Sequence, residues 1–293
     1  METAQQFYPT YKIKDPKFSI EELSSYSLNI LVSDSDCSVA VIDVRKSRCL
    51  YAEKSEFEKT YSSKQQITIL EQFYEDHHFL KAGFWKSINI SLKNDKFSLV
   101  PLSLFDDSIA DEYLALNCEI DRKNETIYNY QHKNVGACNV FSLDNDLQEW
   151  FKITYPTRDI NFIHQTSAFI EGITKIFTDR KKSLAVLCDH NSINIALIEN
   201  KQLIYCNVFS YNTAEDLLYY VMYVMNELEL NPDKVPVTIW GDFDQTSIYF
   251  AKLFKYIREL HLGHRPETLS FGYVFDELFE HSLFDLLNMH LCE

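Results

Sequence analysis

The chain has 293 residues, 46% of them hydrophobic, with 21 Phe and 18 Tyr. This length suits one large domain or two of ordinary size, and the apolar and aromatic content excludes a disordered chain. The formal net charge of −15 argues against a general nucleic-acid binder and against binding to anionic membranes, because both need clustered Lys and Arg.

The N-terminal segment and the cysteines bear on the compartment. METAQQFYPTYKIKD lacks a basic flank followed by an apolar run. The longest apolar candidate, LLYYVMYVM, is far shorter than the ~20 residues of a membrane span. The seven cysteines are widely spaced and form no CxxC motif, which favours buried free thiols in a reducing compartment. We therefore expect a cytoplasmic protein with neither a membrane nor a nucleic-acid partner.

In chain order, the first part of the sequence predicts an antiparallel meander and then alternating helices and strands. After a short helix at IEELSS, three strands are expected at SLNILVS, SVAVIDV and RCLYAE. SKQQITILEQFYEDHHF has helical spacing, and KSINISLKNDKFSLVP predicts a hairpin around a KNDK turn. The remaining elements of this part are a helix at 108–117, strands at 126–131 and 137–143, a helix at 144–156 capped by Asp144 or Asn145, a strand at 160–165 and a helix at 166–177.

The second part of the sequence repeats this order. Three strands are expected at SLAVLCDH, NSINIALIEN and QLIYCNVFS. TAEDLLYYVMYVMNEL is the strongest predicted helix, because Thr213 and Asp216 form a capping-box pattern and the apolar residues follow one stripe. A strand at VPVTIW, a helix at DQTSIYFAKLFKYIREL and one or two amphipathic helices over FDELFEHSLFDLLNMHL complete it.

The two strand triplets match one another. When Asp34 is aligned with Asp189, each of them ends an apolar first strand and precedes a short polar turn. Beyond the turn Val39 matches Ile193 and Tyr51 matches Tyr205. Each triplet is followed by a helix, a strand and a helix, so the sequence predicts an α/β chain of two similar halves. Each half would be a mixed sheet with flanking helices.

This pattern resembles the actin-like ATPase fold, which is a duplicated ribonuclease-H-like domain found in actin, sugar kinases, heat-shock chaperones and the pilus-assembly actin homologue. The chain also resembles a family of uncharacterised bacterial proteins with that fold. The resemblance covers nearly the whole chain. It rests on the two triplets and on three stretches, KFSLVPLSLFDDSIADEYL, NVFSLDNDLQEWF and INFIHQTSAFIEGI.

The resemblance implies a nucleotide site between the halves. In actin-like ATPases two hairpins cradle the phosphates, and an acidic residue at the end of each first strand helps to hold the metal ion, which points to Asp34 and Asp189. In this family a glycine-rich turn lies near the nucleotide base, and the segment Trp240–Asp244 corresponds to it with the single glycine Gly241. If Mg-ATP binds, the resemblance assigns the following residues to it: Asp34, Ser35, Asp36, Asp189, His190, Asn191, Gly241 and Asp242.

The departures from that pattern favour a degenerate site. The hairpin turns, read as Ser35-Asp36-Cys37 and His190-Asn191-Ser192, contain no glycine, although close approach of backbone N–H groups to phosphate favours glycine. Asn, Asp and Ser still permit tight turns. Asp36 adds a second carboxylate near the expected polyphosphate. We expect no bound cofactor and no catalytic residues, a pseudo-ATPase.

Other candidate sites are weaker. His77-His78 and His261-Leu-Gly-His264 lack a Cys or acidic partner at ligand spacing. Cys188 beside Asp189 is expected to pack in a sheet rather than to act as a nucleophile. No Walker loop, GxSxG or HExxH motif is present. No set of carboxylates in one half indicates a nuclease.

The tyrosines at 219, 220 and 223 and the segment after Phe271 are alternative partner surfaces or cover for the chain's own core. Our hypothesis divides the chain into a first half, 1–180, and a second half, 181–293, with helix 166–177 as the crossover. The leading function is a non-catalytic interaction or scaffold protein with an unidentified protein partner. The alternative is an Mg-ATP-binding ATPase that uses the cleft between the halves.

Overall fold

A computed structural model describes residues 8–178 and 182–292. Its strands in chain order are β1 (Tyr8–Lys14), β2 (Tyr26–Val32), β3 (Asp36–Asp43), β4 (Arg48–Glu56), β5 (Ser87–Leu92), β6 (Phe97–Pro101), β7 (Glu125–His132), β8 (Ala137–Asp144), β9 (Ile160–His164), β10 (Lys182–Cys188), β11 (Ser192–Glu199), β12 (Gln202–Ser210), β13 (Val237–Trp240) and β14 (Leu260–Leu262).

The α-helices are α1 (Ser63–Asp76), α2 (Ala110–Ala115), α3 (Asn145–Thr154), α4 (Gln165–Ile176), α5 (Ala214–Glu227), α6 (Ile248–Phe254) and α7 (Phe284–Asn288). Short 3₁₀ helices are η1 (Ile20–Ser25), η2 (His78–Lys81), η3 (Leu102–Leu104), η4 (Asp107–Ile109), η5 (Tyr273–Glu277) and η6 (Met289–Leu291). Within the described residues, no helix combines the length and the apolarity needed to cross a bilayer.

Two large mixed sheets dominate the molecule. The first has the order β1-β4-β3-β2-β5-β9, and the second has the order β12-β11-β10-β13-β14. In each sheet the three meander strands pair antiparallel, and two further strands lie parallel to the first meander strand. The predicted mixed sheets and α/β class are therefore confirmed. The predicted boundary between residues 180 and 181 lies outside the described residues.

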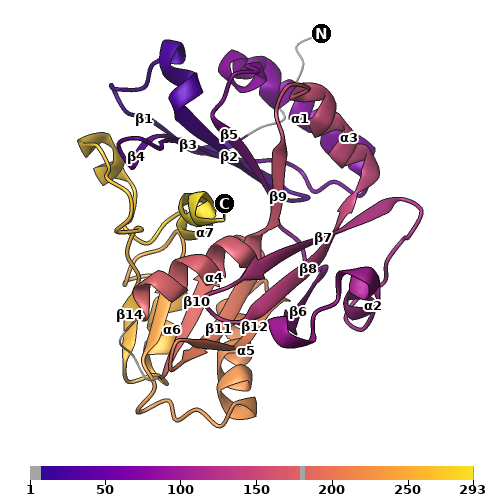
Figure 1. Ribbon diagram of the computed structural model, residues 1–293. Coiled ribbons are helices and arrows are strands. Elements are labelled where there is room, and N and C mark those ends of the chain that lie inside the picture. Colours follow the sequence, from indigo (N-terminus) through magenta and orange to yellow (C-terminus); the bar gives the residue numbers. More distant parts are fainter. Residues whose placement is uncertain (1–7, 179–181, 293) are drawn as a thin grey trace.

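The helices cover these sheets in layers. Helices α1 and α3 bury Phe73 and Phe151 on one face of the first sheet, and α5 and α6 bury Val221 and Leu253 on one face of the second. Helices α4 and α7 lie between the two sheets, as Figure 1 shows. The two sheets therefore share a common central layer.

Close contact between α4 and α7 depends on Gly172. A β-carbon at this position would lie 2.5 Å from Nδ2 of Asn288 and 2.8 Å from the ring of Phe284. On the other side of Phe284, the indole of Trp240 packs with a ring-centroid distance of 4.4 Å. The absence of a side chain at Gly172 thus lets the central layer pack tightly against the second sheet.

One predicted pairing is wrong. The segment 86–101 does not form a hairpin, because β5 lies between β2 and β9 in the first sheet, whereas β6 pairs with β8 in a third sheet of order β6-β8-β7. Asn89, buried in β5, bonds across both neighbouring strands to Asn29 and Asn161. The alternation of apolar residues predicted both strands correctly but carried no information about their partners.

Three other expectations change in detail. Strand β1 was not predicted. The helix expected over 244–260 is limited to α6, and β14 begins within the predicted range. The tail forms only short helices, and α7 and η6 are largely buried among the chain's own elements. All seven cysteines are free thiols, five of them buried, as expected.

Candidate functional site

The two hairpins that contain the predicted site face one another at the junction of the sheets. In the first hairpin, β2 and β3 are joined by residues 33–35, so Asp36 and Cys37 belong to β3 rather than to the turn. The Ser33 hydroxyl oxygen accepts bonds from the backbone N–H groups of Ser35 and Asp36, at 3.1 and 2.8 Å. Both hairpins form without a left-handed residue in the turn, because the residues with positive φ in the described chain lie elsewhere.

A group of charged side chains joins the hairpins. We call Asp36, Lys54, Lys93, Asp189 and Asp242 the central ion network. Lys54 Nζ lies 2.8 Å from Oδ1 of Asp189 and 3.3 Å from Oδ2 of Asp242. Lys93 Nζ lies 2.7 Å from Oδ2 of Asp36 and also bonds to Oδ2 of Asp189. Each carboxylate oxygen of Asp189 therefore has its own ammonium group.

Burial and charge set the protonation states of this network. Burial by itself lowers the pKa of Lys54, but Asp189 and Asp242 outweigh it and raise that pKa well above its ordinary value. Lys93 behaves in the same way beside Asp189 and Asp36. Burial raises the pKa of Asp189, but the two ammonium groups outweigh it and hold that pKa well below its ordinary value. All three groups are charged at neutral pH.

Asp34 lies outside the network. Its carboxylate is about half exposed and pairs at 3.0 Å with Lys59, whose side chain is 55% exposed. Asp36, by contrast, is buried and bonds to Lys93 and to the Ser33 hydroxyl. The acidic residue of the first hairpin that shares a partner with Asp189 is therefore Asp36, and not Asp34.

Gly241 and Asp242 reach the network from the end of β13. Gly241 has a φ of +150°, and a β-carbon there would lie 2.7 Å from the carbonyl oxygen of Cys188. This close approach to β10 needs glycine. A cavity of about 30 Å³ is lined by Gly241 and Asp242 together with Lys54, Asp189 and the buried Asp285. That volume suits one or two water molecules.

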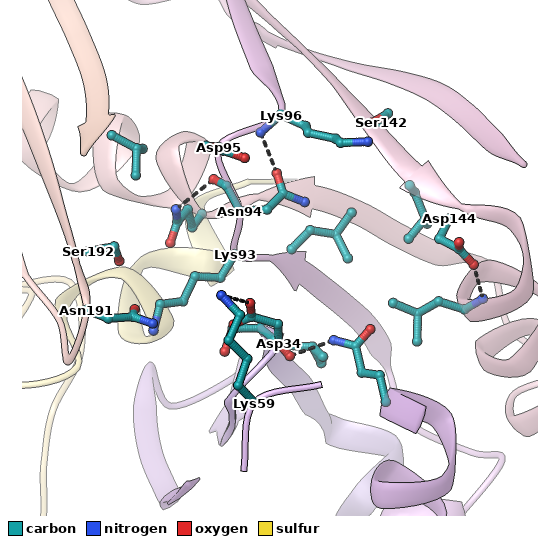
Figure 2. A pocket seen from close by; sticks show the side chains of 18 of the residues that line it. Asp34, Lys59, Lys93, Asn94, Asp95, Lys96, Ser142, Asp144, Asn191 and Ser192 are labelled. Carbon is teal, nitrogen blue, oxygen red and sulfur yellow. Dashed lines mark hydrogen bonds and ion pairs between the residues drawn. The ribbon is translucent and has the colours of Figure 1, made fainter. Parts of the chain in front are cut away.

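A second and larger cavity, of about 380 Å³, lies on the other side of Lys93 (Figure 2). Asp34 and Asn191 line it, one from each hairpin, together with residues 93–96 of the β5–β6 connection. Ser35, Asp36 and His190 line neither cavity. The predicted nucleotide residues are therefore not brought together in one cavity: Asp34 and Asn191 line the larger one, and Asp189, Gly241 and Asp242 line the smaller one.

Sequence reasoning missed both lysines of the network. Lys54 follows Glu53 in the middle of β4, where seven consecutive residues are buried, and charged residues in such a strand need partners. That was an available signal. Lys93 belongs to the KNDK segment that the sequence predicts as a hairpin turn, and nothing local to it indicates its partners. Among the described residues, no group of three or more His, Cys, Asp or Glu is arranged to hold a metal.

Solved structures resemble the fold of this chain over most of its length. A Bacteroides thetaiotaomicron protein with an actin-like ATPase fold and unknown function aligns with a TM-score of 0.79 and 20% identity, over 94% of this chain and 99% of that one. Residues 15–260 match the family described as "Protein of unknown function (DUF3822)". The chain belongs to the DUF3822 family. It has an actin-like ATPase fold, as predicted.

More distant structures share the fold of this DUF3822 chain. The PilM-PilN type IV pilus biogenesis complex aligns with a TM-score of 0.58 and 8% identity, over 90% of this chain and 97% of that one. The ethanolamine utilization protein EutJ from Carboxydothermus hydrogenoformans aligns with a TM-score of 0.51 and 9% identity, over 96% and 93%. No curated protein sequence matches the chain.

Proposed function

We propose that this DUF3822 protein is a non-catalytic interaction or scaffold protein whose actin-like nucleotide site is degenerate. The observation that carries the proposal is the pairing of Asp189 with Lys54 and Lys93. Two cations supplied by the chain itself neutralise the carboxylate that the fold would use for a metal ion. These ion pairs then join the two halves without a bound ligand.

A magnesium ion fits these residues poorly. Mg²⁺ takes oxygen ligands in a near-octahedral shell and keeps several waters. To reach Asp189 it would displace two ammonium groups whose side chains are only 8% and 5% exposed. Two like unit charges 4 Å apart repel by about 4 kcal/mol at an effective dielectric of 20. The displaced lysines would have no solvated position close by.

The space beside Asp189 is also small. The cavity between Asp189 and Gly241 has a volume of about 30 Å³, whereas pockets for ligands of nucleotide size span roughly 300–1,000 Å³. Gly241 already packs against Cys188, so the turn that would face a nucleotide base lies directly against the sheet. Both features support a site that serves structure rather than nucleotide binding.

Exposed aromatic residues support an interaction role. On α5, Tyr219 and Tyr223 stack on each other at a centroid distance of 6.0 Å, and both are exposed. Tyr256 lines the same shallow surface and is also exposed. Tyr220 instead stacks on Phe209 at 4.7 Å and covers the core. Aromatic side chains are enriched where proteins bind one another.

The proposal includes the organisation and the compartment of the chain. Apart from β1, which has no counterpart in the second sheet, the two large sheets have matching strand orders, and this supports a duplicated unit with halves 1–180 and 181–293. Seven free cysteines support a reducing compartment, the bacterial cytoplasm.

Calorimetric titration with Mg-ATP and Mg-ADP tests the proposal. We expect no binding to the intact chain at millimolar nucleotide and no change in its melting temperature. Tight binding of Mg-ATP that Asp34→Ala abolishes, and that the distant exposed Asp233→Ala leaves unchanged, would show a working nucleotide site and overturn the proposal.

The second candidate function is Mg-ATP binding in the cleft between the halves. It is favoured by one observation: the cavity of about 380 Å³ is lined by both hairpins, through Asp34 and Asn191. This candidate predicts that the same titration gives saturable binding and that hydrolysis of ATP follows it.

A further inference from the structure

The larger cavity has the size of a ligand site. Its volume of about 380 Å³ falls within the range of small-molecule pockets. Its walls come from both hairpins, from the β5–β6 connection, from the end of β8 and from the start of α4. Figure 2 shows Ser142 and Asp144 facing the cavity from one wall, with Asn191 and Ser192 opposite.

Three buried polar atoms in these walls have no hydrogen-bond partner in the protein. They are Oε1 of Gln165, Oγ of Ser142 and Oγ of Ser192. Gln165 is only 1% exposed, and its Nε2 already donates to the carbonyl oxygen of Asn94 at 3.2 Å. Its Oε1 therefore remains a free acceptor. Buried polar groups normally have partners. The free Oε1 of Gln165 therefore indicates a ligand that donates hydrogen bonds.

The charges of the cavity point to a cation. Its three lining lysines are all engaged with carboxylates: Lys59 with Asp34, Lys93 within the central ion network, and Lys96 with Glu125. An anionic ligand would therefore share each ammonium group with a carboxylate that repels it. In contrast, Asp95 is exposed and forms no ion pair with any described residue, and it lies beside Lys96 on the same connection.

Apolar side chains line the rest of the cavity. Leu92, Leu143, Leu147 and Val208 all contribute to the walls. Charged side chains such as Lys and Arg combine an aliphatic stem with a polar end, and such a stem packs well on an apolar wall. A compact, fully hydrated metal ion would gain nothing from these residues.

We propose that this cavity binds an organic cation, an ammonium or guanidinium group on an aliphatic stem. Its N–H groups donate to Oε1 of Gln165 and to the carboxylate of Asp95, the serine hydroxyls complete the shell, and the stem lies on the leucines. The inference rests on the proposed function only in taking the cavity not to hold a nucleotide. Such a group reaches the site from a free amine or from a Lys or Arg side chain of a partner, which the net charge of −15 would attract.

The experiment is a calorimetric titration of the intact chain with three probes. Agmatine and spermidine represent free amines, and an acetylated, amidated tripeptide Gly-Arg-Gly represents a partner's side chain. Inorganic pyrophosphate is the anionic control. We expect saturable binding of at least one cation at millimolar concentration or below, and none of pyrophosphate. Tighter binding of an amine than of the peptide assigns the site to a metabolite, and the reverse assigns it to a partner protein.

Two variants test the geometry. Asp95→Asn, at an exposed position that leaves folding intact, should weaken binding about tenfold, because it removes a charged acceptor. Gln165→Met should weaken it about fivefold or more, through loss of a neutral acceptor. The matched control Asp233→Asn, an exposed acid in the other half, should leave binding unchanged.

Absence of binding of all three cations overturns the inference, and so does equal weakening by Asp95→Asn and Asp233→Asn, which would indicate unspecific attraction to an acidic protein. The nucleotide titration separates the two proposals. Mg-ATP binding with cation binding retained would defeat the proposed function alone. Failure of both ligands to bind would defeat this inference alone.

Discussion

The two hairpins look alike in sequence but hold their acidic residues in opposite environments. Asp34 in the first is about half exposed and pairs with an exposed lysine. Asp189 in the second is 16% exposed at its side chain and pairs with two buried lysines that come from the other sheet. The same residue type at matching positions is therefore a surface charge in one hairpin and part of the internal structure in the other.

The difference teaches that the two large sheets are joined by ion pairs at only one of the two matching acidic positions. Both lysines of the central ion network lie in the first sheet or directly after it, and the carboxylate that they share lies in the second. A buried charge that loses its partner is costly, whereas an exposed pair contributes little. Substitutions at the two hairpins should therefore differ strongly in effect.

The largest effect is expected for Asp189→Ala. The change leaves Lys54 and Lys93 buried with fewer carboxylates, and it should lower the free energy of unfolding by about 3–5 kcal/mol. Urea unfolding followed by circular dichroism measures this loss. A loss below about 1 kcal/mol, the range of exposed pairs, would mean that the network does not hold the two sheets together.

A smaller effect of opposite sign is expected for Asp285→Asn. Burial, reinforced by the nearby charge of Asp189, raises the pKa of Asp285 to about 6. The folded state therefore keeps a proton that the unfolded chain releases near pH 4, and stability falls as the pH rises from about 4 to 6. Asparagine removes this penalty and should raise the free energy of unfolding by about 2 kcal/mol at pH 8.

The control for Asp285→Asn is the same comparison at pH 4. There the carboxyl group is protonated in the folded state, and the variant should match the unmodified chain closely. Asparagine also keeps an acceptor for the backbone N–H of Leu286, which bonds to Asp285 at 2.9 Å. An equal gain at both pH values would show that charge is not the cause.

The smallest effect is expected for Asp34→Ala. Its ion pair with Lys59 is exposed, so the free energy of unfolding should fall by no more than about 1 kcal/mol. Salt at about 1 M shortens the Debye length to roughly 3 Å and should remove even this difference. A loss that matches that of Asp189→Ala, or one that salt does not alter, would remove the contrast between the hairpins.

Local patterns in the sequence predicted much of the fold. The alternation of apolar residues gave both meanders. The predicted cap at Asp144 accepts bonds from the N–H groups of Asp146 and Leu147, and Thr213 and Asp216 form the predicted capping box. These features depend on neighbours in the chain, which is why they can be read from it. The pairing of strands does not depend on neighbours in the chain. The prediction that β5 and β6 form a hairpin was therefore wrong.

The candidate site was less predictable for the same reason. Asp189 is identifiable at the end of its strand, but its partners Lys54 and Lys93 lie far away in the sequence. Asp34 and Asp36 are two residues apart, and only the tertiary structure distinguishes the exposed one from the buried one. Long-range charge pairing leaves no periodic signal in a single sequence.

The central layer has a consequence for how the chain folds during synthesis. Leu286, Met289 and Cys292 pack against Leu31 and Ala40 in the first sheet. These partners leave the ribosome at different times, because the two strands are translated long before the α7–η6 segment. The part of the first sheet that these residues cover stays exposed until translation passes residue 292. This is the kind of exposed intermediate on which chaperones act.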